Sequence, residues 1–277
     1  MVNFNGELLF TENAKFSIEN RAFKYGDAIF ETIKVSQKKI IFWEDHYFRL
    51  MASMRMLRMR IPMQFTLEFL KNEILKTIEV QDNAPFFRVR LTVFRKDGGF
   101  YTPKTNKVDY LLEVQETTSF TKKEYTIDLF KDFYNYSGLL STIKTNNRMV
   151  NTLASIFAKE NGIDNCVLLN ERKGVVEVAN GNIFIVKDTI IKTPAITEGC
   201  IKGIIRKKVI EIITKSKDFS IEETVISPFE IQKADEVFIT NAIIGIQPVT
   251  NYKKKSFTTE IANKLANNLK VLQIAGN

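Results

Sequence analysis

Three features between residues 142 and 206 have types and an order that suit catalysis. Lys144 ends an apolar-flanked segment, and a lysine amine that burial keeps neutral is a nucleophile. Glu177 follows two valines and can present a carboxylate at the end of a strand. Gly203 precedes a helix-like segment, and the first backbone N–H groups of a helix form an anion site. This stretch therefore offers an amine, a carboxylate and an anion-binding turn.

These three groups are the ones that a pyridoxal phosphate enzyme requires from its protein. The lysine holds the cofactor aldehyde as a Schiff base, an acidic partner keeps the pyridine nitrogen protonated, and an anion site anchors the phosphate. Taken singly, each feature also fits a solvated lysine or an ordinary strand end. Their order and spacing carry the interpretation.

Six ordered segments, spread between Asn5 and Pro248, show a family resemblance. They are Asn20–Thr32, His46–Leu50, the stretch around Lys144, Glu177–Phe184, Gly203–Arg206 and Asp235–Pro248. In these segments the chain resembles the class IV (fold type IV) pyridoxal phosphate enzymes. That family includes branched-chain aminotransferases, D-amino acid aminotransferases and 4-amino-4-deoxychorismate lyases.

The resemblance implies a role for particular residues. Lys144 matches the Schiff-base lysine, which also moves the substrate proton, and Glu177 matches the carboxylate that faces the pyridine nitrogen. Arg49 matches the arginine that grips the cofactor phosphate with a permanent charge and a bidentate fork. The other residues implied in cofactor binding are Ile204, Ile205, Asn241 and Ala242.

The resemblance leaves two reactions open, and we place amino transfer first. Phe30-Glu31-Thr32 looks like the aminotransferases, whereas Ile205 and the Asn241–Ala242 turn stand where those enzymes usually have hydroxyl groups, and look like the lyases. The first interpretation is transfer between a branched-chain-like amino acid and a 2-oxo acid. The alternative is the release of pyruvate and 4-aminobenzoate from 4-amino-4-deoxychorismate. The D-amino acid reaction is set aside, because the loop Lys96–Thr102 lacks the arginine and histidine of those enzymes.

Composition excludes other classes of protein. With 277 residues, 44% hydrophobic and 26% charged, the chain suits a soluble globular protein with one large or two smaller domains. A formal charge of +8 raises the question of nucleic-acid binding. The lysines are scattered, however, and the longest basic run is Lys253–Lys255, so we expect a lysine-rich surface and no nucleic acid partner.

The histidine and cysteine content limits the chemistry further. His46 is the only histidine, and Cys166 and Cys200 have no metal-ligand spacing, so we expect no metal site. A serine–histidine hydrolase would need His46, but no Gly-x-Ser-x-Gly motif is present, and we expect a packing or helix-surface role for this residue. No secretory signal and no apolar run of ~20 residues is visible, which predicts a cytoplasmic protein without a membrane partner.

Hydrophobic periodicity predicts an α+β fold with two domains, at residues 1–118 and 123–277, joined by a polar linker at 116–123. The smaller first domain is expected to be α/β, with a hairpin at Asn5-Gly6, a second hairpin over 30–43, helices after Glu44 and at 66–79, and strands at 86–94 and 108–114.

The second domain is expected to be β-rich, and the resemblance implies that it is β-barrel-like. Its strands are predicted at 125–131, 165–170, 182–187 and 235–240, with peripheral helices near 149–160, 203–215 and 258–271. The resemblance also implies a homodimer and a cofactor site at the cleft between the domains.

Overall fold

The computed structural model describes residues 1–81, 84–118 and 120–275, and the chain divides into two compact units. Unit 1 is Met1–Ser119 with Lys144–Asn147, and unit 2 is Phe120–Ile143 with Arg148–Asn277. The short segment that carries Lys144 thus belongs to unit 1, although unit 2 surrounds it in sequence. Ser119 of the predicted linker lies outside the described residues, and the predicted domain boundary stays a prediction.

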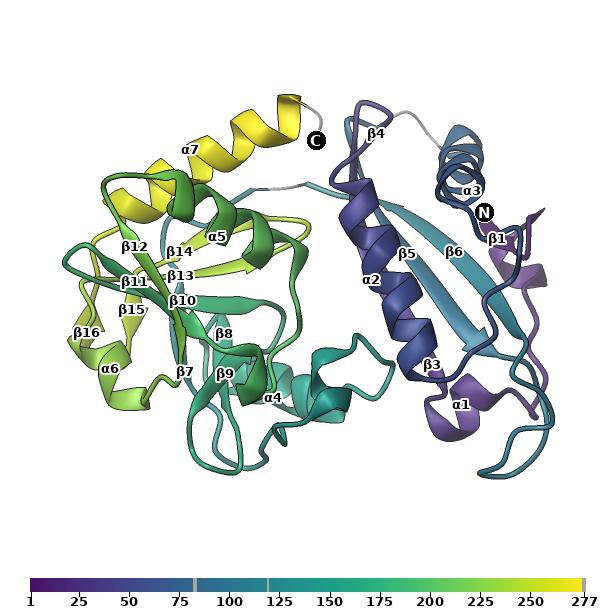
Figure 1. The fold of residues 1–277 in the computed structure, drawn as a ribbon, viewed down its shortest axis with the longest axis horizontal. Helices are drawn as coiled ribbons and strands as arrows, with labels where there is room; N and C mark the ends of the chain where they lie inside the picture. Colours follow the sequence, from purple (N-terminus) through teal and green to yellow (C-terminus); the bar gives the residue numbers. More distant parts are fainter. Residues whose placement is uncertain (82–83, 119, 276–277) are drawn as a thin grey trace. The chain divides into compact units, whose positions relative to one another are not determined.

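Unit 1 is an antiparallel six-stranded sheet with helices packed against it (Figure 1). Along the sheet, the strands follow the order β2 (Glu7–Leu9), β1 (Val2–Phe4), β6 (Val108–Glu116), β5 (Phe86–Arg95), β3 (Ala28–Ser36) and β4 (Lys39–Ile40). The helices are α1 (Arg21–Tyr25), α2 (Trp43–Met56) and α3 (Leu67–Glu79), with a short 3-10 turn η1 (Thr11–Asn13). Helix α2 packs on β3, and α3 packs on β6 and β1. From Val108 to Val114, every second residue of β6 is buried, as expected of a strand with one face on a core.

The tight turns of unit 1 follow from their residues. Asn5 and Gly6 have φ values of 52° and 92°, which a two-residue hairpin turn requires, so the predicted first hairpin is confirmed. The second hairpin turns at Gln37 and Lys38, which also have positive φ.

The predicted second hairpin is longer than the observed one. Its returning strand β4 ends at Ile40 rather than at Trp43. Phe42 adopts a left-handed conformation, and α2 begins at Trp43, with two acidic residues in its first turn that favour a helix start. The indole nitrogen of Trp43 donates a hydrogen bond of 3.0 Å to the Leu67 carbonyl, which connects the start of α2 to the start of α3.

Unit 2 contains two five-stranded sheets. The first has the order β12 (Ser220–Thr224), β11 (Ile190–Pro194), β10 (Asn182–Lys187), β13 (Glu236–Asn241) and β14 (Gly245–Val249). The second has the order β16 (Lys255–Ser256), β15 (Asn251–Tyr252), β7 (Thr126–Leu129), β8 (Asn165–Leu169) and β9 (Val175–Val178). Its helices are α4 (Met149–Glu160), α5 (Ile204–Lys215), α6 (Pro228–Lys233) and α7 (Glu260–Ala275), with 3-10 turns η2 (Leu139–Thr142) and η3 (Ile196–Glu198).

One apolar core joins the two sheets of unit 2. It takes fully buried side chains from both, among them Ile127, Val167, Val178, Ile183 and Ile239. Helices α5 and α7 cover β13 and its neighbours, and α4 packs on β8 (Figure 1). The predicted α+β class, with a β-rich second part and peripheral helices, is therefore confirmed. Within the described residues, no helix has the length and apolarity needed to cross a membrane.

Candidate active site

Lys144 is held against strand β3 of unit 1. The Phe30 backbone N–H donates a hydrogen bond of 2.9 Å to the Lys144 carbonyl, and Thr145 forms an antiparallel bridge with Ile29. The Lys144 Nζ atom lies 4.5 Å from the centroid of the Phe30 ring. Both the backbone and the amine of this lysine are thus positioned by β3.

Arg90 lies on the same aromatic ring and was not predicted. Its guanidinium carbon is 3.7 Å from the centroid of the Phe30 ring, and its Nη2 atom donates to Asn146 Oδ1 at 3.2 Å. Burial lowers the pKa of Arg90, while the Glu113 carboxylate acts in the opposite direction. The sequence signal that could have indicated Arg90 is its position between apolar residues of a predicted strand. An amine and a guanidinium therefore share one ring in unit 1.

Arg49, which is partly buried, forms an ion pair with the buried Glu31. Its Nε atom donates to Glu31 Oε1 at 2.8 Å, and its Nη2 atom donates to Glu31 Oε2. Burial disfavours the ionised carboxylate, but the Arg49 charge and hydrogen bonds from His46 and Arg49 outweigh it and lower the pKa of Glu31 to about 2. Any anion that binds Arg49 must share its five N–H donors with Glu31.

His46 completes this network from the same helix as Arg49. It is 1% exposed, and its Nδ1 atom lies 2.7 Å from Glu31 Oε2. Burial lowers the pKa of His46, and the Arg49 charge adds to this, while Glu31 acts in the opposite direction. Because an ionised carboxylate only accepts hydrogen bonds, Nδ1 of the neutral ring carries the proton. A packing role is thus confirmed for His46, and a helix-surface role is wrong.

Glu177 lies in β9 of unit 2 and is 2% exposed. Its carboxylate accepts a hydrogen bond of 3.1 Å from the Ile201 backbone N–H. The Ile201 carbonyl in turn accepts a bond of 2.9 Å from the Asn182 side chain. Both backbone polar groups of Ile201 are therefore hydrogen-bonded, which fixes the segment before α5.

The start of α5 depends on a glycine at position 203. Gly203 has a φ of −65°, which any residue can adopt, but an added Cβ would overlap the Asn182 side-chain oxygen. Ile204 and Ile205 have buried apolar side chains without donors, so they can serve an anion at the helix start only through their backbone N–H groups.

The Asn241–Ala242 turn lies next to Asn182 on the neighbouring strand, because Asn182 pairs with Thr240. The Asn241 Oδ1 atom accepts bonds of 3.1 and 2.9 Å from the backbone N–H groups of Ile243 and Ile244. Thr240 Oγ1 is buried and, within the described part of the chain, has no hydrogen-bond partner. A polar group without a partner therefore lies at this turn.

The structure thus gathers the predicted residues into one set in each unit. Unit 1 has Lys144 on Phe30 and Arg49 on Glu31, the next residue of β3. Unit 2 has Glu177, the start of α5 and the Asn241–Ala242 turn around Asn182. Among the residues described, no group of three or more His, Cys, Asp or Glu side chains is placed to hold a metal ion.

Comparison with known proteins identifies the family. The family model of amino-transferase class IV matches residues 28–252. A probable branched-chain-amino-acid aminotransferase of Aquifex aeolicus is 32% identical over 260 residues, which are 89% of this chain and 82% of the relative. An aminodeoxychorismate lyase of Vibrio harveyi is 26% identical over 240 residues, 83% and 85% of the two chains.

The fold agrees with this result. The crystal structure of a branched-chain aminotransferase from Thermoproteus uzoniensis with norvaline matches with a TM-score of 0.90 at 21% identity, and the match covers 100% of this chain and 95% of that one. The predicted family, fold type and enzyme class are confirmed, and the chain belongs to the class IV aminotransferases.

Proposed function

We propose that this enzyme uses pyridoxal phosphate to transfer an amino group between a branched-chain-like amino acid and a 2-oxo acid. The observation that carries this proposal is the amine and the guanidinium that share the Phe30 ring. Lys144 supplies an amine, and Arg90 supplies a guanidinium suited to a substrate carboxylate. The Aquifex aeolicus relative supports the choice of amino acid.

The residues of unit 2 fit a phosphorylated pyridine. The absence of a side chain at Gly203 lets Asn182 pack closely against the start of a 12-residue helix, and Thr240 Oγ1 is buried without a partner among the described residues. We assign the phosphate to Arg49, to the backbone of Ile204 and Ile205, and to the Asn241–Ala242 turn. Pyridoxal phosphate, when bound, supplies an electron sink for the substrate carbon that loses its proton.

The remaining chemistry belongs to two side chains of the protein. The Lys144 amine would take the proton from the substrate Cα atom and deliver it away from that carbon, because returning it to Cα would only regenerate the amino acid. The Glu177 carboxylate holds a proton at the pyridine nitrogen, and its bond to the Ile201 N–H keeps it in position. Removing either group should therefore slow the proton transfers rather than unfold the protein.

A lyase reaction is the second candidate, and a specific observation favours it. Ile205 and the Asn241–Ala242 turn provide no hydroxyl group where aminotransferases usually have one. The Vibrio harveyi relative is named as a lyase. Release of pyruvate and 4-aminobenzoate from 4-amino-4-deoxychorismate would need the same lysine.

An assay of the purified holoenzyme separates the two reactions. Leucine alone should give one equivalent of its keto acid per active site, and continued turnover should require 2-oxoglutarate, as in ping-pong kinetics. If no amino acid gives a keto acid while 4-amino-4-deoxychorismate gives pyruvate and 4-aminobenzoate, the lyase replaces the aminotransferase.

We also infer a homodimer, in agreement with the family resemblance. Unit 1 exposes Phe23, Phe100 and Tyr101, each more than 80% exposed, and large exposed aromatic groups are typical of surfaces that bind protein. Sedimentation equilibrium should give twice the 31.9 kDa mass of one chain, and a monomer at micromolar concentration would contradict the inference. The cytoplasmic location stays a prediction.

A further inference from the structure

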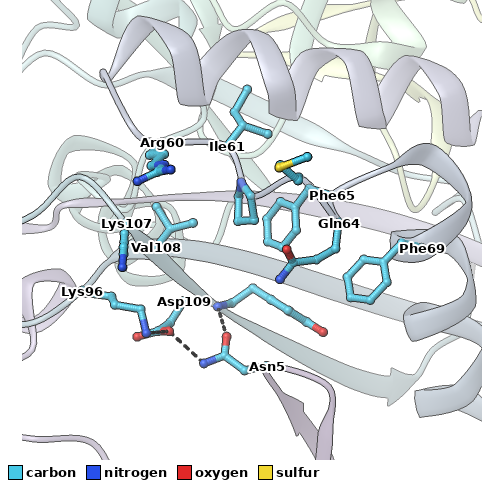
Figure 2. Close-up of a pocket in the computed structure, with 13 residues that line it drawn as sticks. Asn5, Arg60, Ile61, Gln64, Phe65, Phe69, Lys96, Lys107, Val108 and Asp109 are labelled. Atoms are coloured by element: carbon cyan, nitrogen blue, oxygen red, sulfur yellow. Dashed lines mark hydrogen bonds and ion pairs between the residues drawn. The ribbon is translucent and has the colours of Figure 1, made fainter.

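Unit 1 contains a cavity between β6 and the segment that joins α2 to α3 (Figure 2). The cavity measures about 450 Å³, within the range of roughly 300–1,000 Å³ typical of small-molecule sites. None of its lining residues is among those that we assign to the cofactor. It therefore needs an explanation of its own.

One side of this cavity is aromatic. The rings of Phe65 and Tyr110 meet edge to face at 5.4 Å, and Phe69 stacks on Phe65 at 6.3 Å. The Tyr110 hydroxyl donates to Glu73 at 3.1 Å, and the Tyr47 hydroxyl donates to the Phe65 carbonyl at 3.0 Å. These bonds hold the rings in place, so the cavity presents a rigid apolar wall to a ligand.

The opposite side is cationic. Figure 2 shows Arg60, Lys96 and Lys107 on one side of the cavity and Phe65 and Phe69 on the other. A cavity with such walls would orient a ligand that has one charged end and one apolar end.

Among the described residues that line the cavity, Asp109 is the only carboxylate, and it already has two partners. Asp109 lies 2.9 Å from the Lys96 amine and also accepts a bond of 2.8 Å from Asn5. Arg60 and Lys107 form no ion pair with any carboxylate in the described part of the chain. Two positive charges therefore remain without a neutralising side chain beside an apolar wall.

We propose that this cavity is a second ligand site, which binds a small carboxylate with an aromatic or branched aliphatic body. The carboxylate lies between Arg60 and Lys107, and the body packs on Phe65 and Phe69. A cationic ligand would be repelled by the two charges. A neutral apolar ligand would leave both charges without an anion. The proposal does not depend on the reaction that the enzyme catalyses.

Calorimetric titration of the holoenzyme with 3-phenylpropanoate tests this site. We expect saturable binding of the carboxylate, and binding of 3-phenylpropanamide and of inorganic phosphate at least about tenfold weaker, because each lacks one of the two features. Equal affinity for the amide would contradict the cationic role. Equal affinity for phosphate would reduce the cavity to a simple anion site.

Substitutions locate the binding, since the catalytic site also accepts carboxylates. The double variant Arg60→Gln, Lys107→Gln should bind 3-phenylpropanoate about ten- to a hundredfold more weakly. Both side chains are exposed, so folding should be kept. Lys71→Gln, on α3 outside the cavity, is the matched control and should bind as the wild type does. Unchanged affinity in the double variant, or no saturable binding to the wild type, would overturn the proposal.

Discussion

The two units support their site residues by different physical means. In unit 1 the ionisable groups are held by one another, since Arg49 and His46 both bond to the buried Glu31 carboxylate. In unit 2 the Glu177 carboxylate is held by a backbone N–H, and the neighbouring turn depends on amides and on a glycine. The first arrangement depends on charge and the second on space, so each should fail under a different perturbation.

Glu31→Gln should have the largest effect on folding. Removing the negative charge opposite Arg49 in a buried pair should lower the free energy of unfolding by about 3–5 kcal/mol. Trp43, the only tryptophan, lies in α2 of unit 1, so its fluorescence during urea unfolding reports on this unit. Glu68→Gln, at an exposed ion pair of the same unit, should change the value by less than about 1 kcal/mol. Equal losses in the two variants would contradict the contrast between buried and exposed pairs.

Glu177→Gln should act on turnover instead of folding. The amide oxygen can still accept from the Ile201 N–H, but it cannot hold a proton on the pyridine nitrogen, so kcat should fall about 10²–10³-fold. The matched control is Glu236→Gln, because Glu236 is equally buried and accepts bonds from the backbone N–H groups of Ile261 and Ala262. This control should lose stability and keep its kcat. A normal kcat in Glu177→Gln would remove this residue from the mechanism.

Gly203→Ala tests the dependence of unit 2 on space. The added methyl group should displace Asn182 and weaken cofactor binding by about 1–3 kcal/mol, as is typical of overpacking. The φ of −65° at Gly203 suits alanine, so backbone strain should not contribute to this loss. Gly138→Ala is the control, because among the described residues, its two chain neighbours apart, no atom lies within 4 Å of a Cβ added there, and its backbone is extended. Titration of apoenzyme with pyridoxal phosphate measures both affinities. Equal affinities in the two variants would show that Gly203 does not shape the site.

The smallest effect should be the pH dependence of the stability of unit 1. The folded state keeps His46 neutral with a lowered pKa, whereas the unfolded chain takes up a proton below about 6.5. The contribution of His46 to the free energy of unfolding is therefore fully present above pH 6.5 and is lost as the pH falls below this value. The loss should be less than about 1.4 kcal/mol per pH unit. Glu31 acts in the same direction at lower pH, between its ordinary value of 4.5 and its folded pKa of about 2.

Urea midpoints from Trp43 fluorescence between pH 7 and pH 5 measure this dependence. His46→Asn should flatten it, because asparagine can still donate to Glu31 but does not titrate. A slope that is the same in both proteins would assign the pH dependence to another group.

Local patterns explain which elements could be predicted from the sequence. The apolar periodicity of residues 149–160 predicted helix α4 with the bounds that are observed. Asn5-Gly6 predicted its hairpin turn, because both residues readily adopt positive φ. Two short helices also carry start signals in the sequence. Asn20 caps Phe23 at the start of α1, and Ser227 begins α6 with a capping box.

Contacts between distant residues could not be predicted in this way. Lys144 bonds to Phe30, 114 positions earlier, and Arg90 meets the same ring from another strand. No periodicity indicates such contacts, because they depend on the register of β3 and β5. The roles of Lys144 and Glu177 came from the family resemblance, and Arg90 and the Glu31 pairing came only from the structure.

The most direct test of the central claim is to identify the lysine that binds the cofactor. The holoenzyme is reduced with borohydride, which makes the bond between cofactor and lysine permanent, and the labelled peptide is then sequenced. The account predicts one label per chain, on Lys144, and none on the Lys144→Arg variant. A label on any other lysine, or a purified protein that neither contains nor binds pyridoxal phosphate, would contradict it.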